Sequence, residues 1–211
     1  MATVTDITKQ KKKGRVNIFL DGEFYCGLDE FTALSLRIAV GKEYDEDELK
    51  EIVAESEKRS AFDKAAKYVS FRPRTEREIR KYLSGREYSA EIVDYAVAKL
   101  AEYGYVNDLR FCREYARAYS VKSGVNKIRA DLMRLGAKRE AIDEALSEIE
   151  DQSEAAYVAA QKWARMHRVF DIRKLKAHLY SKGFEPDDIS EAAGKIAEEY
   201  GKDGEDEEWS E

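Results

Sequence analysis

The sequence predicts a mostly α-helical protein: three tandem three-helix repeats in an elongated, curved array, preceded by a small segment that contains a β-hairpin. Three observations support this fold class. A pattern of apolar residues recurs about every 48 residues through roughly the last 150 residues of the 211-residue chain. Each copy of the pattern carries the same change from basic to acidic charge. The first 56 residues lack the pattern and contain a hairpin signal instead.

Residues 1–56 are expected to form a hairpin covered by helices. Two apolar and aromatic runs, 16–20 and 23–27, flank Asp21 and Gly22. This dipeptide suits the positive φ angles of a type I′ turn, so the two runs pair as a hairpin. Residues 4–8 add a third strand at the edge. Because a lone hairpin is only marginally stable in water, we expect two helices, at 30–37 and 45–56, to cover it.

The apolar pattern of each repeat is an i, i+4 pair followed, after a turn, by a second helical stripe. Such a pattern predicts two amphipathic helices joined by a turn. A unit of this size lies near the limit of independent stability, so neighbouring units are expected to stack. The aligned positions of the pair and the turn are Ile79, Ile128 and Leu175; Leu83, Leu132 and Leu179; and Tyr88, Ala137 and Phe184.

Turn and capping residues divide each repeat into three helices. Pro73 interrupts the first repeat, and Thr75 with Glu78 forms a capping box that starts the next helix. The expected helices are 60–70, 75–84 and 89–103; 108–121, 125–135 and 138–149; and 152–167, 171–182 and 186–200. The predicted domains are 1–56, 57–107, 108–151 and 152–202, followed by a disordered acidic tail at 203–211.

Basic surface recurs in phase with the repeats, although the whole chain has a net charge of −6. Residues 58–86, 110–138 and 162–182 hold ten, eight and seven basic residues, against three, two and one acidic residues. Exposed ion pairs stabilise a fold by only ~0.2–1 kcal/mol, whereas clustered cations attract an anionic partner. We therefore interpret the three stretches as binding surface, with ordinary solvated helix faces as the alternative.

The most specific motif is the turn that contains Arg72, Arg74 and Arg77. The helix macrodipole disfavours cations at the start of a helix. Arginine binds a phosphate or a carboxylate with better geometry than lysine, because its planar guanidinium can donate two parallel hydrogen bonds. These three arginines are therefore expected to bind a partner. The full set of candidate binding residues is Arg72, Arg74, Arg77, Arg110, Arg113, Arg117, Lys122, Lys127, Arg129, Lys174, Lys176 and Lys182.

The first helix of the second repeat carries an aromatic stripe. Phe111, Tyr115 and Tyr119 recur at i, i+4 and i+8, and we interpret them as core rather than as a base-stacking platform. The three arginines of the same helix lie on a different face and are expected to be free to bind. Asp108 is expected to be the N-cap of this helix.

The sequence carries no sign of catalysis. No apolar run approaches the roughly 20 residues that cross a bilayer, and the amino terminus lacks a signal-peptide core, so we expect a cytoplasmic protein.

Cys26 and Cys112 are expected to be free thiols, and His167 and His178 to be partly exposed structural residues. No phosphate-binding loop, dinucleotide fingerprint or nucleophile elbow occurs. We therefore predict a binding protein without catalytic residues, cofactor or metal.

Four motifs of the chain are Asn17-Ile18-Phe19-Leu20-Asp21-Gly22-Glu23-Phe24, Arg72-Pro73-Arg74-Thr75-Glu76, Gly124-x-x-Lys127-Ile128-x-x-x-Leu132 and Lys182-Gly183-Phe184. Together they resemble the RecX family, bacterial modulators of the recombinase RecA, and the resemblance runs in order from about residue 4 to residue 200. Leu135 departs from the family pattern, because members often carry a basic residue there.

The resemblance implies a monomer that lies in the helical groove of the filament formed by RecA on single-stranded DNA. There it would limit filament growth and lower the ATPase, strand exchange and coprotease activity of RecA. The candidate basic residues would contact acidic RecA side chains or DNA phosphate, which the sequence does not distinguish. Two alternatives stay open: a nucleic-acid-binding repeat protein without a dedicated protein partner, and a helical scaffold that recognises an acidic protein.

Overall fold

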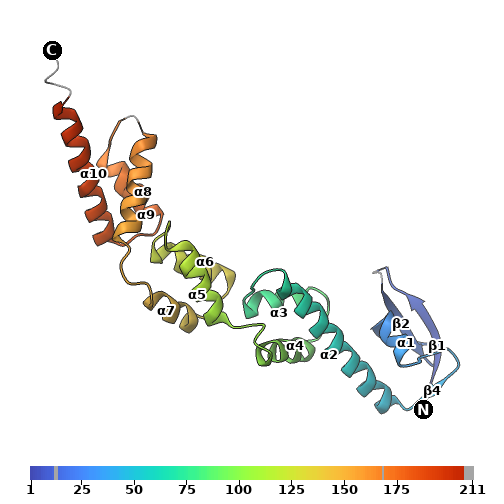
Figure 1. Cartoon of the computed structure of the whole chain (residues 1–211). Coiled ribbons are helices and arrows are strands. Elements are labelled where there is room, and N and C mark those ends of the chain that lie inside the picture. The colour runs from blue at the N-terminus through green and yellow to red at the C-terminus, as the bar shows by residue number, and fades with distance from the viewer. Residues whose placement is uncertain (12–13, 168, 207–211) are drawn as a thin grey trace. The chain divides into compact units, whose positions relative to one another are not determined.

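The structure is a computed structural model that describes residues 1–11, 14–167 and 169–206, with the backbone alone for 201–206. These residues form four strands and ten helices, which confirms the prediction of a mostly α-helical protein with a small strand segment at its start (Figure 1). The chain divides into two compact units, Met1–Pro73 with Glu78–Val106, and Arg74–Arg77 with Asn107–Glu211. Within the described ranges, none of the helices combines the length and hydropathy needed to span a bilayer.

An antiparallel four-stranded sheet in the order β3-β2-β1-β4 opens the chain. Its strands are β1 (Ala2–Lys9), β2 (Arg15–Leu20), β3 (Glu23–Asp29) and β4 (Glu43–Tyr44). The hairpin prediction is confirmed: φ is 48° at Asp21 and 88° at Gly22, as a type I′ turn requires. The third strand also forms, but not at the edge, because β4 pairs with its first residues. A strand of two residues is too short to leave an alternation pattern in the sequence.

Helices α1 (Glu30–Ser35) and α2 (Glu46–Ser70) follow the strands, as predicted for the cover of the hairpin. Ala33 of α1 and Leu49 of α2 lie in one buried cluster with the apolar residues of the sheet. The prediction of separate helices at 45–56 and 60–70 is wrong, because α2 runs through both. Residues 57–59 include no glycine or proline, so nothing in the backbone ends the helix there. The boundaries of the predicted domains stay predictions.

The remaining helices follow the three predicted repeats closely. Repeat 1 comprises the second half of α2 with α3 (Glu76–Ser84) and α4 (Ala90–Glu102); repeat 2 comprises α5 (Asp108–Tyr119), α6 (Val125–Leu135) and α7 (Arg139–Ser147); and repeat 3 comprises α8 (Ser153–Met166), α9 (Ile172–Ser181) and α10 (Pro186–Asp206). Because α10 extends to Asp206, the first four residues of the predicted disordered tail are helical. Residues 207–211 lie outside the described part of the chain.

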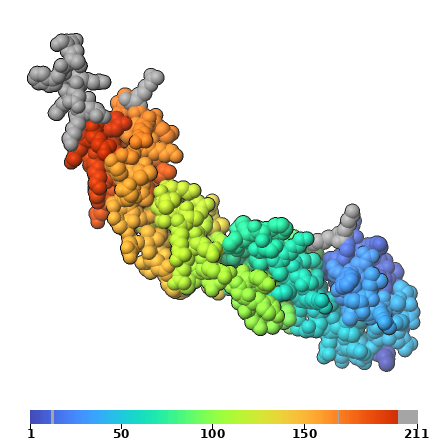
Figure 2. Space-filling model, in the orientation of Figure 1, coloured from blue at the N-terminus to red at the C-terminus, as the bar shows by residue number. Residues whose placement is uncertain are grey.

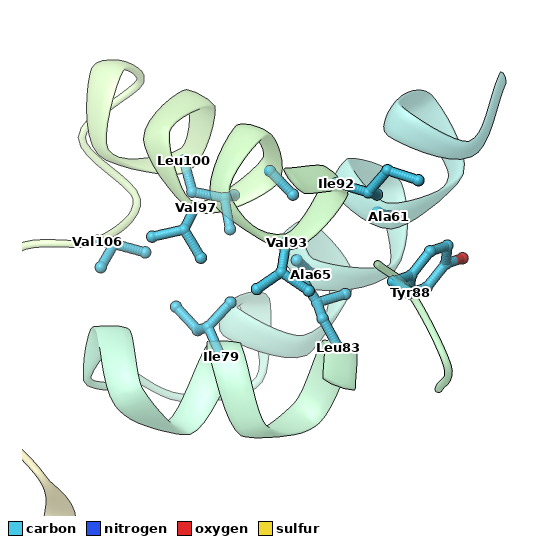
Figure 3. Packing of buried hydrophobic residues seen from close by; sticks show 11 residues of the cluster. Ala61, Ala65, Ile79, Leu83, Tyr88, Ile92, Val93, Val97, Leu100 and Val106 are labelled. Carbon is cyan, nitrogen blue, oxygen red and sulfur yellow. The ribbon is translucent and has the colours of Figure 1, made fainter. Parts of the chain in front are cut away.

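Each repeat has its own apolar core, built on the aligned positions of the sequence pattern. Figure 3 shows Ile79 and Leu83 of α3 pointing toward Val93 and Val97 of α4 and toward Ala65 of α2. Their counterparts in the other repeats are equally buried, with 0–1% of the side chains exposed. The apolar pattern therefore predicted the core positions correctly.

Repeats 2 and 3 meet through backbone contact at two glycines. The Gly124 N–H donates to the Lys182 carbonyl at 2.9 Å, and the Asn126 N–H donates to the Gly183 carbonyl at 3.1 Å. A Cβ atom on Gly124 would lie 2.0 Å from the carbonyl oxygen of Gly183, far inside van der Waals contact. The start of α6 thus binds the last carbonyls of α9, and neither partner has room for a side chain.

Gln152 closes the same junction from the linker between α7 and α8. Its side chain is buried, with 4% exposed. Its Oε1 accepts the Val125 N–H at 2.9 Å, and its Nε2 donates to the carbonyls of Ser120 and Ser123 at 3.1 and 3.2 Å. One amide therefore satisfies backbone groups at the end of α5 and at the start of α6, which a buried helix terminus needs.

Asp108 does not cap its own helix, contrary to expectation. The N-cap of α5 is Asn107, whose side chain accepts the Arg110 N–H at 2.8 Å. Asp108 instead accepts the N–H of Glu76 at 2.9 Å and the N–H of Lys138 at 3.3 Å. Its carboxylate therefore caps the first residues of α3 and α7, two helices that are distant from it in sequence.

Candidate binding surface

The arginine turn before α3 holds its three candidates in different settings. The guanidinium of Arg72 is exposed and pairs with the carboxylate of Glu78 at an N–O distance of 2.6 Å. Arg74 is half-buried, and Arg77 is exposed. The aliphatic stem of Arg77 covers Gly136, where a Cβ atom would lie 2.2 Å from Arg77 Cδ. Packing of Arg77 against Gly136 and the ion pair of Arg72 with Glu78 therefore help to anchor the turn.

In repeat 2, two of the candidate arginines are paired with acids of α7. Arg113 of α5 lies 3.1 Å from Glu144 and 2.6 Å from Glu148. Arg129 of α6 pairs with Asp143. The expectation that Arg113 is free to bind is therefore wrong. Part of the alternation of charge along the sequence serves ion pairs inside the repeat.

The other candidates in repeat 2 reach solvent. Arg110, Arg117, Lys122 and Lys127 are all exposed. The ammonium of Lys122 lies 4.6 Å from the ring centroid of Tyr119, close enough for a cation–π contact. These four cations are positioned on α5, on the α5–α6 turn and on the first turn of α6.

The aromatic stripe of α5 passes from the core to the surface. Phe111 is buried and Tyr115 half-buried, whereas 37% of Tyr119 is exposed. The rings of Tyr115 and Tyr119 are stacked, with centroids 4.3 Å apart and an interplanar angle of 18°. The core interpretation is therefore right for Phe111 and wrong for Tyr119, because the helix axis carries the stripe out of the apolar core.

The candidates of repeat 3 lie on α9 and at its end. Lys174 and Lys176 are exposed, and Lys182 is half-buried. The ammonium of Lys174 lies 3.9 Å from the carboxylate of Asp171, at the outer limit of an ion pair. The backbone carbonyl of Lys182 is the acceptor for Gly124 described above, so this residue belongs to the junction between the repeats as well.

Exposed apolar side chains accompany each basic stretch, which the sequence analysis did not identify. The exposed fractions are 76% for Phe71, 68% for Val121, 73% for Met166, 79% for Val169 and 73% for Tyr180. None of these residues belongs to the aligned apolar pattern. Their position outside that pattern could have indicated, from the sequence alone, that they are not part of the core. Cations beside exposed apolar groups are typical of surfaces that bind other proteins.

The two histidines meet at one tryptophan. His167 stacks on Trp163 with ring centroids 4.0 Å apart, and its Nδ1 lies 2.7 Å from the Trp163 carbonyl oxygen. The ring of His178 is tilted by 37° against that of Trp163, with the two centroids 6.4 Å apart. In the described part of the chain, no group of three or more histidine, cysteine or acidic side chains is arranged to hold a metal ion.

The stability of repeat 3 is expected to fall in mild acid because of His178. Burial lowers the pKa of His178 below its ordinary value of 6.5, and the positive charges of Lys182 and His167 add to the effect. A depressed pKa means that the unfolded chain takes up the proton first. Stability is therefore full above about pH 6.5 and falls as the pH drops through the window below it. Melting curves at several pH values will show a smaller acid-induced loss for His178→Gln than for the wild type; parallel losses would contradict this assignment.

Replacing Arg113 is expected to cost a little stability, and replacing Arg117 almost none. Arg113→Ala removes both ion pairs, with Glu144 of α7 and with Glu148 directly after it, and because these pairs are exposed they stabilise the fold only weakly, mainly at low salt. Arg117 lies one turn further along α5 and is exposed. Urea unfolding in low and high salt will separate the two variants. Equal losses for both arginines, or a loss for Arg113→Ala that salt does not reduce, would rule out the ion-pair account.

Comparison with protein families gives two matches. The model described as RecX, first three-helix domain, matches residues 61–100. The model described as the regulatory protein RecX N-terminal domain matches residues 2–45. The first match covers most of the core of repeat 1, and the second covers the sheet.

Several relatives named regulatory protein RecX match most of the chain. The relative from Lactobacillus delbrueckii subsp. bulgaricus is 32% identical, over 87% of this chain and 71% of its own length. The relative from Caldanaerobacter subterraneus subsp. tengcongensis is 31% identical, over 90% of this chain and 97% of its own length. The relative from Bacillus subtilis strain 168 is 30% identical, over 97% of this chain and 81% of its own length.

Two solved structures share the fold. A crystal structure of a regulatory protein RecX covers 90% of this chain and 98% of its own, with a TM-score of 0.63 and 29% sequence identity. The structure of RecX from Lactobacillus salivarius covers 67% of this chain and 97% of its own, with a TM-score of 0.62. The second is 23% identical and supports the fold alone.

Proposed function

Because the chain belongs to the RecX family of regulatory proteins, we propose that it is a non-enzymatic modulator of the recombinase RecA. It binds in the groove of the filament that RecA forms on single-stranded DNA. Bound there as a monomer, it limits filament growth and lowers the ATPase, strand exchange and coprotease activity of RecA. The protein acts in the cytoplasm and needs no cofactor.

The observation that supports this proposal is the pairing of exposed apolar side chains with exposed cations in each basic stretch. Phe71 precedes Arg72, and Val121 precedes Lys122, with all four side chains exposed. Naked DNA offers phosphates to the cations and base faces to aromatic rings, but little apolar surface for an exposed valine. A protein-walled groove that contains DNA offers partners for both kinds of side chain. This combination favours a nucleoprotein partner over a plain nucleic-acid binder.

Linking three such surfaces in one chain favours an extended ligand. Once one repeat is bound, the next repeat binds at the effective concentration set by the connection between them, so individually weak contacts add up to a tight complex. A filament offers many equivalent binding sites along its groove, whereas a compact acidic protein offers a single site. Occupation of the groove then opposes the rearrangements that filament growth and strand exchange require.

Salt dependence distinguishes the proposal from its alternatives. Affinity will be measured for naked single-stranded DNA and for the RecA-coated filament between low and physiological salt. A plain nucleic-acid binder loses affinity with a log–log slope of about −0.7 per phosphate contacted on single strands. We expect weak, steeply salt-dependent binding to naked DNA, and tighter binding with a shallower slope to the filament. Equal affinities and equal slopes for naked DNA and filament would mean that the protein is a plain nucleic-acid binder. Binding to an acidic protein without any dependence on DNA would mean that it is a helical scaffold for acidic proteins.

A further inference from the structure

Repeats 1 and 2 neutralise a cation of their middle helix in the same way. Arg80 of α3 pairs with Asp94 of α4. Arg129 of α6, which is aligned with Arg80, pairs with Asp143 of α7, which is aligned with Asp94. The separation is fourteen residues in both repeats. The internal acid is therefore a repeated feature of the fold.

Repeat 3 keeps the cation and lacks the acid. The aligned positions there are Lys176 of α9 and Ser190 of α10. The only acid between residues 162 and 182 is Asp171, whose Oδ1 accepts the N–H groups of Arg173 and Lys174 at 2.9 and 3.2 Å as the N-cap of α9. Of the residues that the structure describes, four exposed cations of this stretch enter no ion pair: Lys162, Arg165, Arg173 and Lys176.

The same part of repeat 3 also carries exposed apolar side chains. Ile172, Lys176 and Tyr180 recur at i, i+4 and i+8, so they share one face of α9. Ile172 is 38% and Tyr180 is 73% exposed, and Met166 and Val169 in the segment before α9 are 73% and 79% exposed. The surface of α8 and α9 is drawn in orange in Figure 2. We call these five residues the α9 face.

Repeat 1 shows that the α9 face is not a requirement of the fold. The positions aligned with Ile172 and Tyr180 are Glu76 and Ser84, both polar. The buried positions of α9, Leu175 and Leu179, are instead apolar in every repeat. Repeat 1 therefore folds with polar residues at the two positions that Ile172 and Tyr180 occupy in repeat 3.

We propose that the α9 face docks a protein surface that presents carboxylates around an apolar patch. Carboxylates of the partner take the place of the acid that repeat 3 lacks, opposite Lys176 and its neighbouring cations. Met166, Val169 and Ile172 lack the aromatic rings that single-strand binders use as stacking platforms for bases, which favours a protein over DNA as the occupant. The inference rests on the proposed function, and within it assigns repeat 3 to the protein wall of the RecA filament rather than to its DNA.

The test replaces apolar groups without changing charge. Val169→Ser/Tyr180→Ser alters two largely exposed side chains, so the melting temperature is expected to stay within the range of ordinary surface changes. The control, Val40→Ser/Tyr105→Ser, changes the same residue types at positions that are 59% and 55% exposed and lie outside the three basic stretches. Affinities of both variants and the wild type will be measured for the RecA–DNA filament and for naked single-stranded DNA.

We expect the α9-face variant to lose about tenfold or more in affinity for the filament, as truncation of an interface anchor does. Its affinity for naked DNA, and both affinities of the control, should stay unchanged. An equal loss on filament and naked DNA would make the α9 face a DNA surface, and no loss on either would remove it from binding altogether. Both outcomes contradict the inference without contradicting the proposed function. The proposed function itself would be contradicted if the wild-type protein did not bind the RecA–DNA filament.

Discussion

Gly124→Ala is expected to lower the free energy of unfolding by about 2–4 kcal/mol, through overpacking and a lost hydrogen bond. The added Cβ would meet the carbonyl oxygen of Gly183 at 2.0 Å and the carbonyl carbon at 2.1 Å. Both atoms are backbone, so no side chain can swing away to relieve the clash. Either the start of α6 or the end of α9 must move, which breaks the hydrogen bond from Gly124 to Lys182. Urea unfolding followed by far-ultraviolet circular dichroism measures the loss.

Gly194→Ala is the matched control for this glycine variant. Gly194 lies inside α10, and a Cβ atom there would meet nothing within 4 Å. Alanine is favoured over glycine in a helix interior by ~1 kcal/mol, so this variant is expected to be slightly more stable than the wild type. If Gly124→Ala behaved like Gly194→Ala, the backbone contact between repeats 2 and 3 would not exist in solution.

Leu132→Ala is expected to cost about 2–5 kcal/mol, because a fully buried leucine leaves a cavity that the surrounding core fills only partly. Leu132 has 0% of its surface exposed and lies in the cluster that includes Ile128 and Ile142. The aligned Leu83→Ala in repeat 1 is expected to cost a similar amount, since Leu83 is equally buried. Thermal and urea unfolding of both variants will report the loss.

Met133→Ala is the control for the leucine variant. Met133 is the next residue along α6 and is 46% exposed. Its replacement removes as many side-chain heavy atoms as Leu132→Ala, but at a position that is only partly buried, so a clearly smaller loss is expected. A loss as large as that of Leu132→Ala would mean that the face of α6 described as exposed is covered in solution.

The secondary structure and the cores could be predicted from the sequence because their causes are local or periodic. The turn at Asp21 and Gly22 depends on two residues that tolerate positive φ. The aligned apolar positions depend on a helix period repeated three times. The prediction of two helices at 45–56 and 60–70 is wrong because no glycine or proline lies between them to end α2.

The partners of the charged residues could be predicted only in part. Asp108 accepts N–H groups from residues 32 positions before it and 30 positions after it, at the starts of α3 and α7, and no local pattern indicates these contacts. By contrast, the pairs of Arg80 with Asp94 and Arg129 with Asp143 recur at aligned positions. Aligning the acids as well as the apolar residues would have revealed them, and would have identified Ser190 as the exception.

The central claim is that this protein modulates RecA, and the ATPase of RecA on single-stranded DNA tests it most directly. The protein will be titrated from far below to equal RecA concentration. The account predicts a fall in ATPase rate at substoichiometric protein, because one molecule in the groove affects many RecA subunits. A fall only near the concentration that covers the DNA would instead indicate simple competition for single strands. No effect at any ratio would contradict the account.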